Sequence, residues 1–153
     1  MKLAVGSDER THLTDGVLAF LESRGYETLR FGPLGGEFSA WPIVAQQVAE
    51  AVAQGKAEQG VLFCWTGTGA AMAANKVPGI RAALVGDSQT AQGARRWNDA
   101  NILVLSLRAT SEAIAQEILT AWFAEPFDPQ EAPCLAHLTA LERKYSLASG
   151  DCT

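Results

Sequence analysis

The sequence predicts an α/β protein whose five parallel strands form one doubly wound sheet in three layers, α/β/α, with an extra C-terminal helix. Apolar runs of strand length alternate with segments of helical periodicity five times along the chain. These runs are continuously apolar, which is typical of parallel strands covered on both faces. With 153 residues, 48% of them hydrophobic, we expect a single domain over residues 1–153.

The first half of the chain shows three apolar runs, each closed by a turn signal. Between the first two runs, Leu13, Val17 and Leu21 recur at helical spacing, and Gly25 ends that stripe. Pro42 can begin the next helix because its missing N–H is not needed in the first turn. We therefore expect strands at residues 3–8, 27–32 and 60–65, helices at 11–24 and 42–54, and a loop at 33–40.

The second half continues the alternation and adds one helix. Its two apolar runs, RAALVGD and ILVLSLR, each precede a segment of helical composition. In the last helix, Leu135, Leu138 and Leu141 form an apolar stripe that can pack on its own subunit or on another. We expect a short helix at 69–76, strands at 81–87 and 102–108, and helices at 88–97, 111–124 and 133–146.

Composition excludes several classes of function. A net charge of −5 argues against nucleic acid or an anionic membrane as a partner. No apolar run approaches the ~18 residues of a membrane-spanning helix, and the N-terminal run is too short for a signal peptide, so we expect a cytoplasmic protein. Cys64, Cys134 and Cys152 are odd in number and lack metal-ligand spacing, which favours free thiols.

Polar or reactive residues follow four of the predicted strands. Ligands of doubly wound sheets bind outside the carboxyl ends of the strands. Asp8 ends the first strand, Cys64 the third, Asp87 the fourth and Arg108 the fifth. These residues, far apart in sequence, are therefore expected to lie along one edge of the sheet.

The stretch CWTGTG, residues 64–69, carries the most specific chemistry. Gly67 and Gly69 let the backbone turn and expose N–H groups to an anion, and the start of the next helix would favour a thiolate at Cys64. A thiolate beside such a cradle suits proton abstraction next to a carbonyl, with the loop holding the enolate. The alternative is a buried small residue before an ordinary turn. Neither nucleotide-binding glycine motif is present, so nucleotide binding is unsupported.

The chain resembles the ribose-5-phosphate isomerase B / galactose-6-phosphate isomerase family over roughly residues 2–127. The resemblance is carried by VGSD (5–8), WPIVAQQVAEAVAQGKAEQGVLFCWTGTG (41–69), AANKVPGIRAAL (73–84) and WNDANILVLSLR (97–108). It implies a Rossmann-like sheet, aldose–ketose isomerisation through an enediolate, no cofactor or metal, and a small sugar or sugar phosphate as substrate. It also implies a homodimer or homotetramer with active sites built across the dimer interface, the last helix included.

The resemblance assigns roles to individual residues. Cys64 matches the catalytic base, Thr66 a residue that assists proton movement between the oxygens, and Asp8 a residue that contacts sugar hydroxyls. Asn98 matches an asparagine beside the sugar, and Arg108 an arginine that reaches a phosphate. Without the resemblance, Asp8 and Asn98 would be interpreted equally well as caps and Arg108 as a surface ion-pair residue. The expected anion hole consists of Trp65, Thr66, Gly67, Thr68 and Gly69.

Departures from the family pattern concern the substrate. Glu9 and Trp97 stand where the family has histidines, the second of which is assigned to ring opening, and Trp65 stands where it has glycine. The family's arginine-rich C-terminal stretch is missing. We therefore expect a substrate that is neutral or carries a single carboxylate and that opens readily. Trp41, Trp65 and Trp97 are expected either to line the sugar pocket or to pack in the core.

Two questions stay open from the sequence. His12 can face the site or be a solvated residue at a helix start, and His137 can lie at an interface or supply an acid across it. The alternative function is a non-catalytic, sugar-binding or regulatory homologue of the family. Retention of Cys64, Thr66 and the glycine loop together speaks against that alternative.

Overall fold

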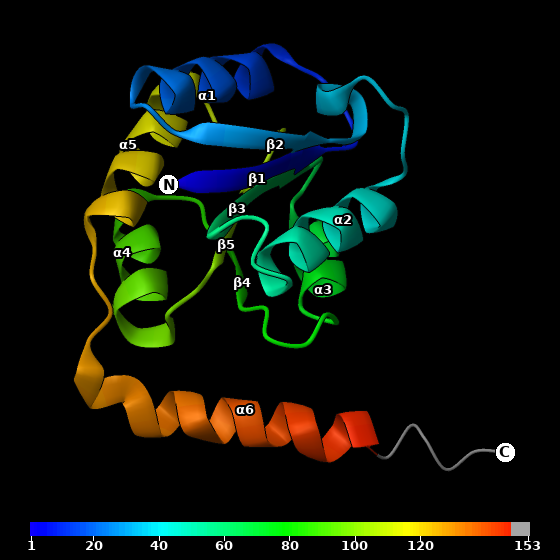
Figure 1. The fold of residues 1–153 in the computed structure, drawn as a ribbon. Helices are drawn as coiled ribbons and strands as arrows, with labels where there is room; N and C mark the ends of the chain where they lie inside the picture. The colour runs from blue at the N-terminus through cyan, green and yellow to red at the C-terminus, as the bar shows by residue number, and fades with distance from the viewer. Residues whose placement is uncertain (148–153) are drawn as a thin grey trace, which may run out of the picture.

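The sheet is the centre of the molecule, and its strands are all parallel. The computed structural model describes residues 1–147, so Cys152 lies outside the described part of the chain. The spatial order is β2-β1-β3-β5-β4, in which the chain winds in one direction from β1 to β2 and in the other from β3 to β4 and β5 (Figure 1). The strands are β1 (Lys2–Ser7), β2 (Glu27–Phe31), β3 (Gln59–Cys64), β4 (Ala82–Leu84) and β5 (Ile102–Ser106). The predicted three-layer α/β/α class is confirmed.

Helices cover both faces of this sheet, as continuous apolar strands require. One face packs against α1, α4 and α5, and the other packs against α2 and α3 (Figure 1). The largest buried side chains, such as Trp122, Phe63 and Leu3, lie on the first face. The helices are α1 (His12–Ser23), α2 (Trp41–Ala53), α3 (Thr68–Ala74), α4 (Ser88–Asn98), α5 (Glu112–Ala124) and α6 (Ala132–Leu147), with 3-10 turns at η1 (Gly32–Gly35) and η2 (Pro129–Glu131).

Side chains at the carboxyl edge of the sheet begin the helices that leave it. Thr11 and Thr14 form a reciprocal capping box at the start of α1. The Asp87 carboxylate accepts the Thr90 N–H at 2.7 Å, and the Ser111 hydroxyl accepts the Ile114 N–H at 3.2 Å. The turns before α1, α4 and α5 are therefore short and fixed by these caps.

Two predicted segments differ from the structure. The fourth strand, expected over seven residues, is three residues long, because β4 pairs only with β5 at the sheet edge and the chain leaves at Gly86 to reach the Asp87 cap. Gly32, expected to end the second strand, and residues 33–35, expected within a loop, form the η1 turn, which Pro33 can begin without an N–H. The remaining helix and strand ends agree with the prediction within two residues.

The C-terminal helix α6 lies apart from the α/β body (Figure 1). Its predicted apolar stripe is partly exposed, since Leu138 is 48% exposed and Leu141 is 40% exposed. The helix covers an open groove of about 1050 Å³ whose floor is formed by residues around β4. In the single chain this stripe is thus only partly covered, and its packing on another subunit stays a prediction. None of the described helices is long and apolar enough to cross a membrane.

Candidate active site

The tips of β1 and β3 meet where the winding direction of the sheet reverses. Ser7 pairs with Phe63 in the parallel register, so the next residues, Asp8 and Cys64, lie beside each other. Neighbouring strands are about 4.8 Å apart. A reversal point of this kind opens a crevice outside the strand ends, which is the usual ligand site of doubly wound sheets.

Cys64 is the last residue of β3 and is 7% exposed. It belongs to the apolar cluster formed with α2 and α3. The neighbouring strand fixes its backbone: the Leu107 N–H donates to the Cys64 carbonyl at 2.9 Å, and the Arg108 N–H donates to the Trp65 carbonyl at 3.1 Å. The Ser106 hydroxyl also donates to the Trp65 carbonyl, at 2.9 Å. The free thiol is thus held at the sheet edge by the tip of β5.

The loop after Cys64 requires its glycines. Gly67 has φ of +82°, and a Cβ there would lie 2.4 Å from Leu84 Cδ1. A Cβ on Gly69 would lie 3.1 Å from the Trp41 ring. Gly67 therefore allows a left-handed turn, and Gly69 leaves room for the Trp41 ring. The Thr66 and Thr68 hydroxyls share a hydrogen bond of 2.7 Å on the solvent side of this loop.

Asp8 brings a carboxylate to the same crevice. Its Oδ1 is buried and has no hydrogen-bond partner among residues 1–147. Leaving such an acceptor unpaired is costly, so a donor from outside the chain would be favourable there. The buried Ser7 hydroxyl donates to the Glu9 carbonyl at 2.5 Å and accepts the Glu9 N–H at 3.2 Å, which fixes the turn and leaves the Glu9 side chain exposed.

A second, smaller cavity of about 510 Å³ continues from the loop toward β4 and β5. Thr66 forms one wall, and Arg108, Ser106 and Thr110 form others. Arg108 is exposed, while Thr110 is buried. The carboxyl edge thus combines a thiol, a carboxylate, several hydroxyls and one guanidinium. It gathers these predicted site residues: Asp8, Glu9, Trp41, Cys64, Trp65, Thr66, Gly67, Thr68, Gly69 and Arg108.

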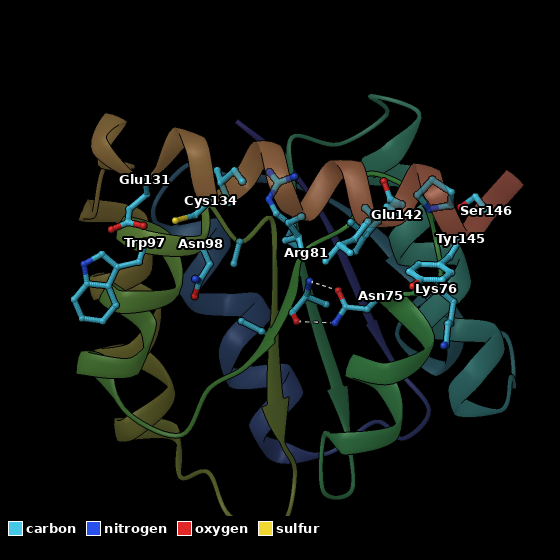
Figure 2. A pocket seen from close by; sticks show the side chains of 18 residues that line it. Asn75, Lys76, Arg81, Trp97, Asn98, Glu131, Cys134, Glu142, Tyr145 and Ser146 are labelled. Atoms are coloured by element: carbon cyan, nitrogen blue, oxygen red, sulfur yellow. Dashed lines mark hydrogen bonds between the residues drawn. The ribbon is translucent and has the colours of Figure 1, made fainter. Parts of the chain in front are cut away.

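Trp97 and Asn98 do not reach this edge within one chain. They end α4, which begins at the carboxyl edge at Ser88 and so ends at the opposite edge of the sheet. Both line the groove beneath α6 (Figure 2). The Trp97 ring lies against Gly93, where a Cβ would be 2.7 Å away. Trp97 therefore does not share a pocket with Trp41 and Trp65 in the isolated chain.

The histidines also lie apart from the thiol. His12 is exposed, and its Nε2 is 3.3 Å from Glu112 Oε1 on α5. This position agrees with the solvated helix start that the sequence allowed. His137 is exposed on α6. In the described part of the chain, no group of three or more His, Cys, Asp or Glu side chains could hold a metal ion.

Sequence reasoning missed a hydrogen-bonded network on the groove side. The Asn75 side chain bonds both the N–H and the carbonyl of Ala82, at 2.8 and 2.9 Å (Figure 2). Asp99 has φ of +43° and accepts hydrogen bonds from Arg81 and Arg95. One feature of the sequence could have indicated this network: asparagine and aspartate occur at the ends of apolar segments, and these residues tolerate such turns.

Fold and site together define the class of protein: a doubly wound α/β protein with a ligand crevice at the reversal point of its sheet, edged by a thiol and a glycine loop. The family model described as Ribose/Galactose Isomerase matches residues 3–135. The chain belongs to this family.

Individual relatives agree with that assignment. The chain is 34% identical to "Ribose-5-phosphate isomerase B" of Escherichia coli K12, covering 94% of this chain and 97% of the relative. It is 35% identical to "D-erythrulose-4-phosphate isomerase" of Pectobacterium atrosepticum, covering 84% and 86%. The solved structure of Clostridium thermocellum ribose-5-phosphate isomerase B has a TM-score of 0.89 at 39% identity, covering 95% of this chain and 99% of that one. The resemblance predicted from sequence is confirmed, and the chain is an enzyme of the aldose–ketose isomerase class to which these relatives belong.

Proposed function

We propose that the protein interconverts an aldose and a ketose through an enediolate, with Cys64 as the base. The thiolate takes the proton from C2 of the open-chain aldose, and the electron pair of that C–H bond moves toward the carbonyl to give the enediolate. Return of the proton to C1 gives the ketose. Thr66 relays the hydroxyl proton between the two oxygens, and the loop from Trp65 to Gly69 faces the negative charge.

One observation carries this proposal: the buried Cys64 thiol lies beside Asp8, whose buried oxygen lacks a partner in the described chain, at the crevice of the sheet. A sugar hydroxyl is the donor that would satisfy Asp8 while placing a carbon near the thiol. Packing of an apolar core around a buried cysteine would not explain an unpaired carboxylate beside it, because such an acceptor is costly to bury. The same geometry disfavours a purely non-catalytic binding role.

The site is completed by a second copy of the chain. Trp97 and Asn98 lie at the edge opposite Cys64, and the apolar stripe of α6 is uncovered. A two-fold dimer places one chain's groove side against its partner's carboxyl edge. Asn98 of one subunit then contacts the sugar held by Cys64 of the other.

The substrate carries at most one negative charge at its non-reacting end. Glu9 and Asp8 add negative charge at the crevice, and Arg108 is the guanidinium that lines the cavity beside the loop. A phosphate of ~2 charges usually requires several donors, arginine forks among them. Trp97, in place of an acid that opens the ring, favours a sugar that is already open-chain.

Solvent exchange tests the reaction itself. Incubation with D-ribose, D-ribose 5-phosphate, D-erythrose or D-erythrose 4-phosphate in D₂O should bring deuterium to C1 or C2 of at least one of them. The matched control is Cys64→Ala, which keeps the pocket and lacks the base. A protein whose melting temperature rises with sugar but which exchanges no proton would be a binder, not an isomerase.

A further inference from the structure

Gly79 joins the C-terminal helix to the turn that carries Asn98. Its N–H donates to both carboxylate oxygens of Glu142 on α6, each at 3.1 Å. Its carbonyl accepts the Asn101 side-chain amide at 2.9 Å. Gly79 has φ of +84°, a conformation that other residues rarely adopt. One residue is therefore fixed from two sides, by α6 and by the segment just after Asn98.

The turn after Asn98 is strained and held by charge. Asp99 is the one non-glycine residue with positive φ in the described chain. The Arg81 side chain donates to the Asp99 carbonyl at 2.8 Å and to its carboxylate at 3.1 Å, and Arg95 donates to the same carboxylate at 3.2 Å. The Asn101 amide oxygen in turn accepts the Arg81 N–H at 2.8 Å. A left-handed aspartate persists only where its surroundings hold it, and here the 79–81 segment does so.

Helix α6 stands over an open groove in the single chain. Its stripe is exposed, and the groove separates it from the body (Figures 1 and 2). Glu142 is half-buried and points toward the body across that groove (Figure 2). Its carboxylate accepts the single Gly79 N–H through both oxygens, and a charge-assisted hydrogen bond of this kind is stronger than a typical exposed ion pair. The position of α6 and the geometry of the turn are thus coupled through Gly79.

We propose that Glu142 is a positioning residue, which sets the Asn98 turn through Gly79 and Asn101. It contacts no reacting atom. Its catalytic consequence rests on the proposed function, since the turn serves the site of the partner subunit. When α6 packs on a partner subunit, it then also fixes the turn that carries Asn98, the residue that completes the partner's site.

Hydrogen exchange tests the positioning without any substrate. In Glu142→Ala, the peptide spanning residues 97–101 should exchange at least ten-fold faster, while β3 is unchanged. Glu142→Gln, which keeps one acceptor oxygen, should restore part of the protection. Asn101→Ala removes the other bond to Gly79 and also the bond to the Arg81 N–H, so it should raise exchange in this peptide at least as much as Glu142→Ala. The matched control Glu117→Ala removes an exposed carboxylate from α5 and should change nothing in this peptide. Unchanged exchange of this peptide in Glu142→Ala would overturn the proposal, whatever the effect of Asn101→Ala.

Mixed dimers test the catalytic consequence. Glu142→Ala should lower kcat/KM by about ten-fold, the size of one charged hydrogen bond, on whichever of the four probe sugars turns over. Co-expressed with Cys64→Ala, it should form dimers with one intact site, whose activity exceeds the mean of the two separate variants. If the activity of the mixed dimers equals that mean, Glu142 acts on the site that contains Cys64 of the same subunit. The proposal that it acts on the partner's site would then be wrong. If no probe sugar turns over, the proposed function fails, and the exchange result alone decides the role of Glu142.

Discussion

The Trp41 ring lies directly against Gly69, so close that a Cβ on the glycine would be 3.1 Å from the ring. This contact joins the start of α2 to the loop that follows Cys64. Trp41 is a predicted pocket residue, so we expect the width of the crevice to depend on the side chain at position 69. Substitution of Gly69 therefore tests whether activity depends on the contact between the loop and Trp41.

Gly69→Ala should displace the Trp41 ring by a few tenths of an ångström and lower kcat/KM about ten-fold, with a smaller effect on stability because the ring is at the surface. Steady-state kinetics and thermal melts measure the two effects. The double variant Gly69→Ala, Trp41→Phe gives the methyl group room and should recover part of the activity. If Gly69→Ala behaves as wild type, the loop does not depend on this contact.

Cys64→Ala should lose at least 99% of turnover and keep its fold, since a methyl group cannot carry the proton and general base catalysis contributes about 10²–10⁴-fold. Cys64→Ser should be nearly as inactive, because a hydroxyl is a far weaker acid than a thiol. Deuterium exchange and initial rates measure both. More than a tenth of wild-type turnover in the alanine variant would exclude Cys64 as the base.

Cys134 is the matched control for the thiol. A hydrogen bond with Glu131, with the charge of that carboxylate, raises the pKa of the Cys134 thiol. Cys134→Ser should therefore leave turnover unchanged. Iodoacetamide should inactivate the enzyme by labelling Cys64, and substrate should slow that labelling but not the labelling of Cys134.

The fold could be predicted because each level of the sequence gave the same result. Continuous apolar runs required helices on both faces, and Gly25 and Pro42 marked helix limits near the observed ones. The length of β4 could not be predicted, since an edge strand stops where its single partner and the next helix cap allow. The carboxyl-edge half of the site followed from topology alone. The place of Asn98 did not, because it lies at the end of helix α4 rather than at a strand end.

Asp87 gives the stability of α4 a predictable pH dependence. Hydrogen bonds from the Thr90 N–H and hydroxyl lower the pKa of the Asp87 carboxyl below its usual 3.8. A lowered pKa in the folded state contributes stability above the ordinary pKa and loses it as the pH falls through the folded value. Asp87→Ala should therefore lower Tm by a few degrees at pH 7 and by less near pH 2–3. Thermal melts at both pH values measure this; a difference that grows toward acid would contradict the sign.

Removal of α6 tests the shared site. A chain ending before Ala132 keeps the sheet and its five covering helices, since α6 packs little on them. It should sediment as a monomer at micromolar concentration, where we expect the full chain to be at least a dimer. It should also lose most activity, because in the proposed shared site Asn98 would no longer reach a partner's crevice. Sedimentation and initial rates are the measurements. A full-length chain that is a fully active monomer would exclude the shared site.

We expect Glu9 and Arg108 to determine which substrate charge the site prefers. Two like charges about 5–6 Å apart repel by about 1–3 kcal/mol at an effective dielectric of 20 or more, which is roughly one to two decades in affinity. Arg108 offers a single guanidinium to offset that repulsion. Among the residues of α6 that line the groove, Cys134 and Glu142 are present and no arginine is. We therefore expect kcat/KM for ribose 5-phosphate to be lower than for an unphosphorylated four- to six-carbon sugar or one with a single carboxylate.

Glu9→Gln should narrow that difference in kcat/KM about ten-fold, because it removes the charge and keeps the size of the side chain. A ten-fold preference for ribose 5-phosphate in the wild-type protein would contradict this, and would mean that a partner subunit supplies phosphate ligands that Glu9 does not oppose.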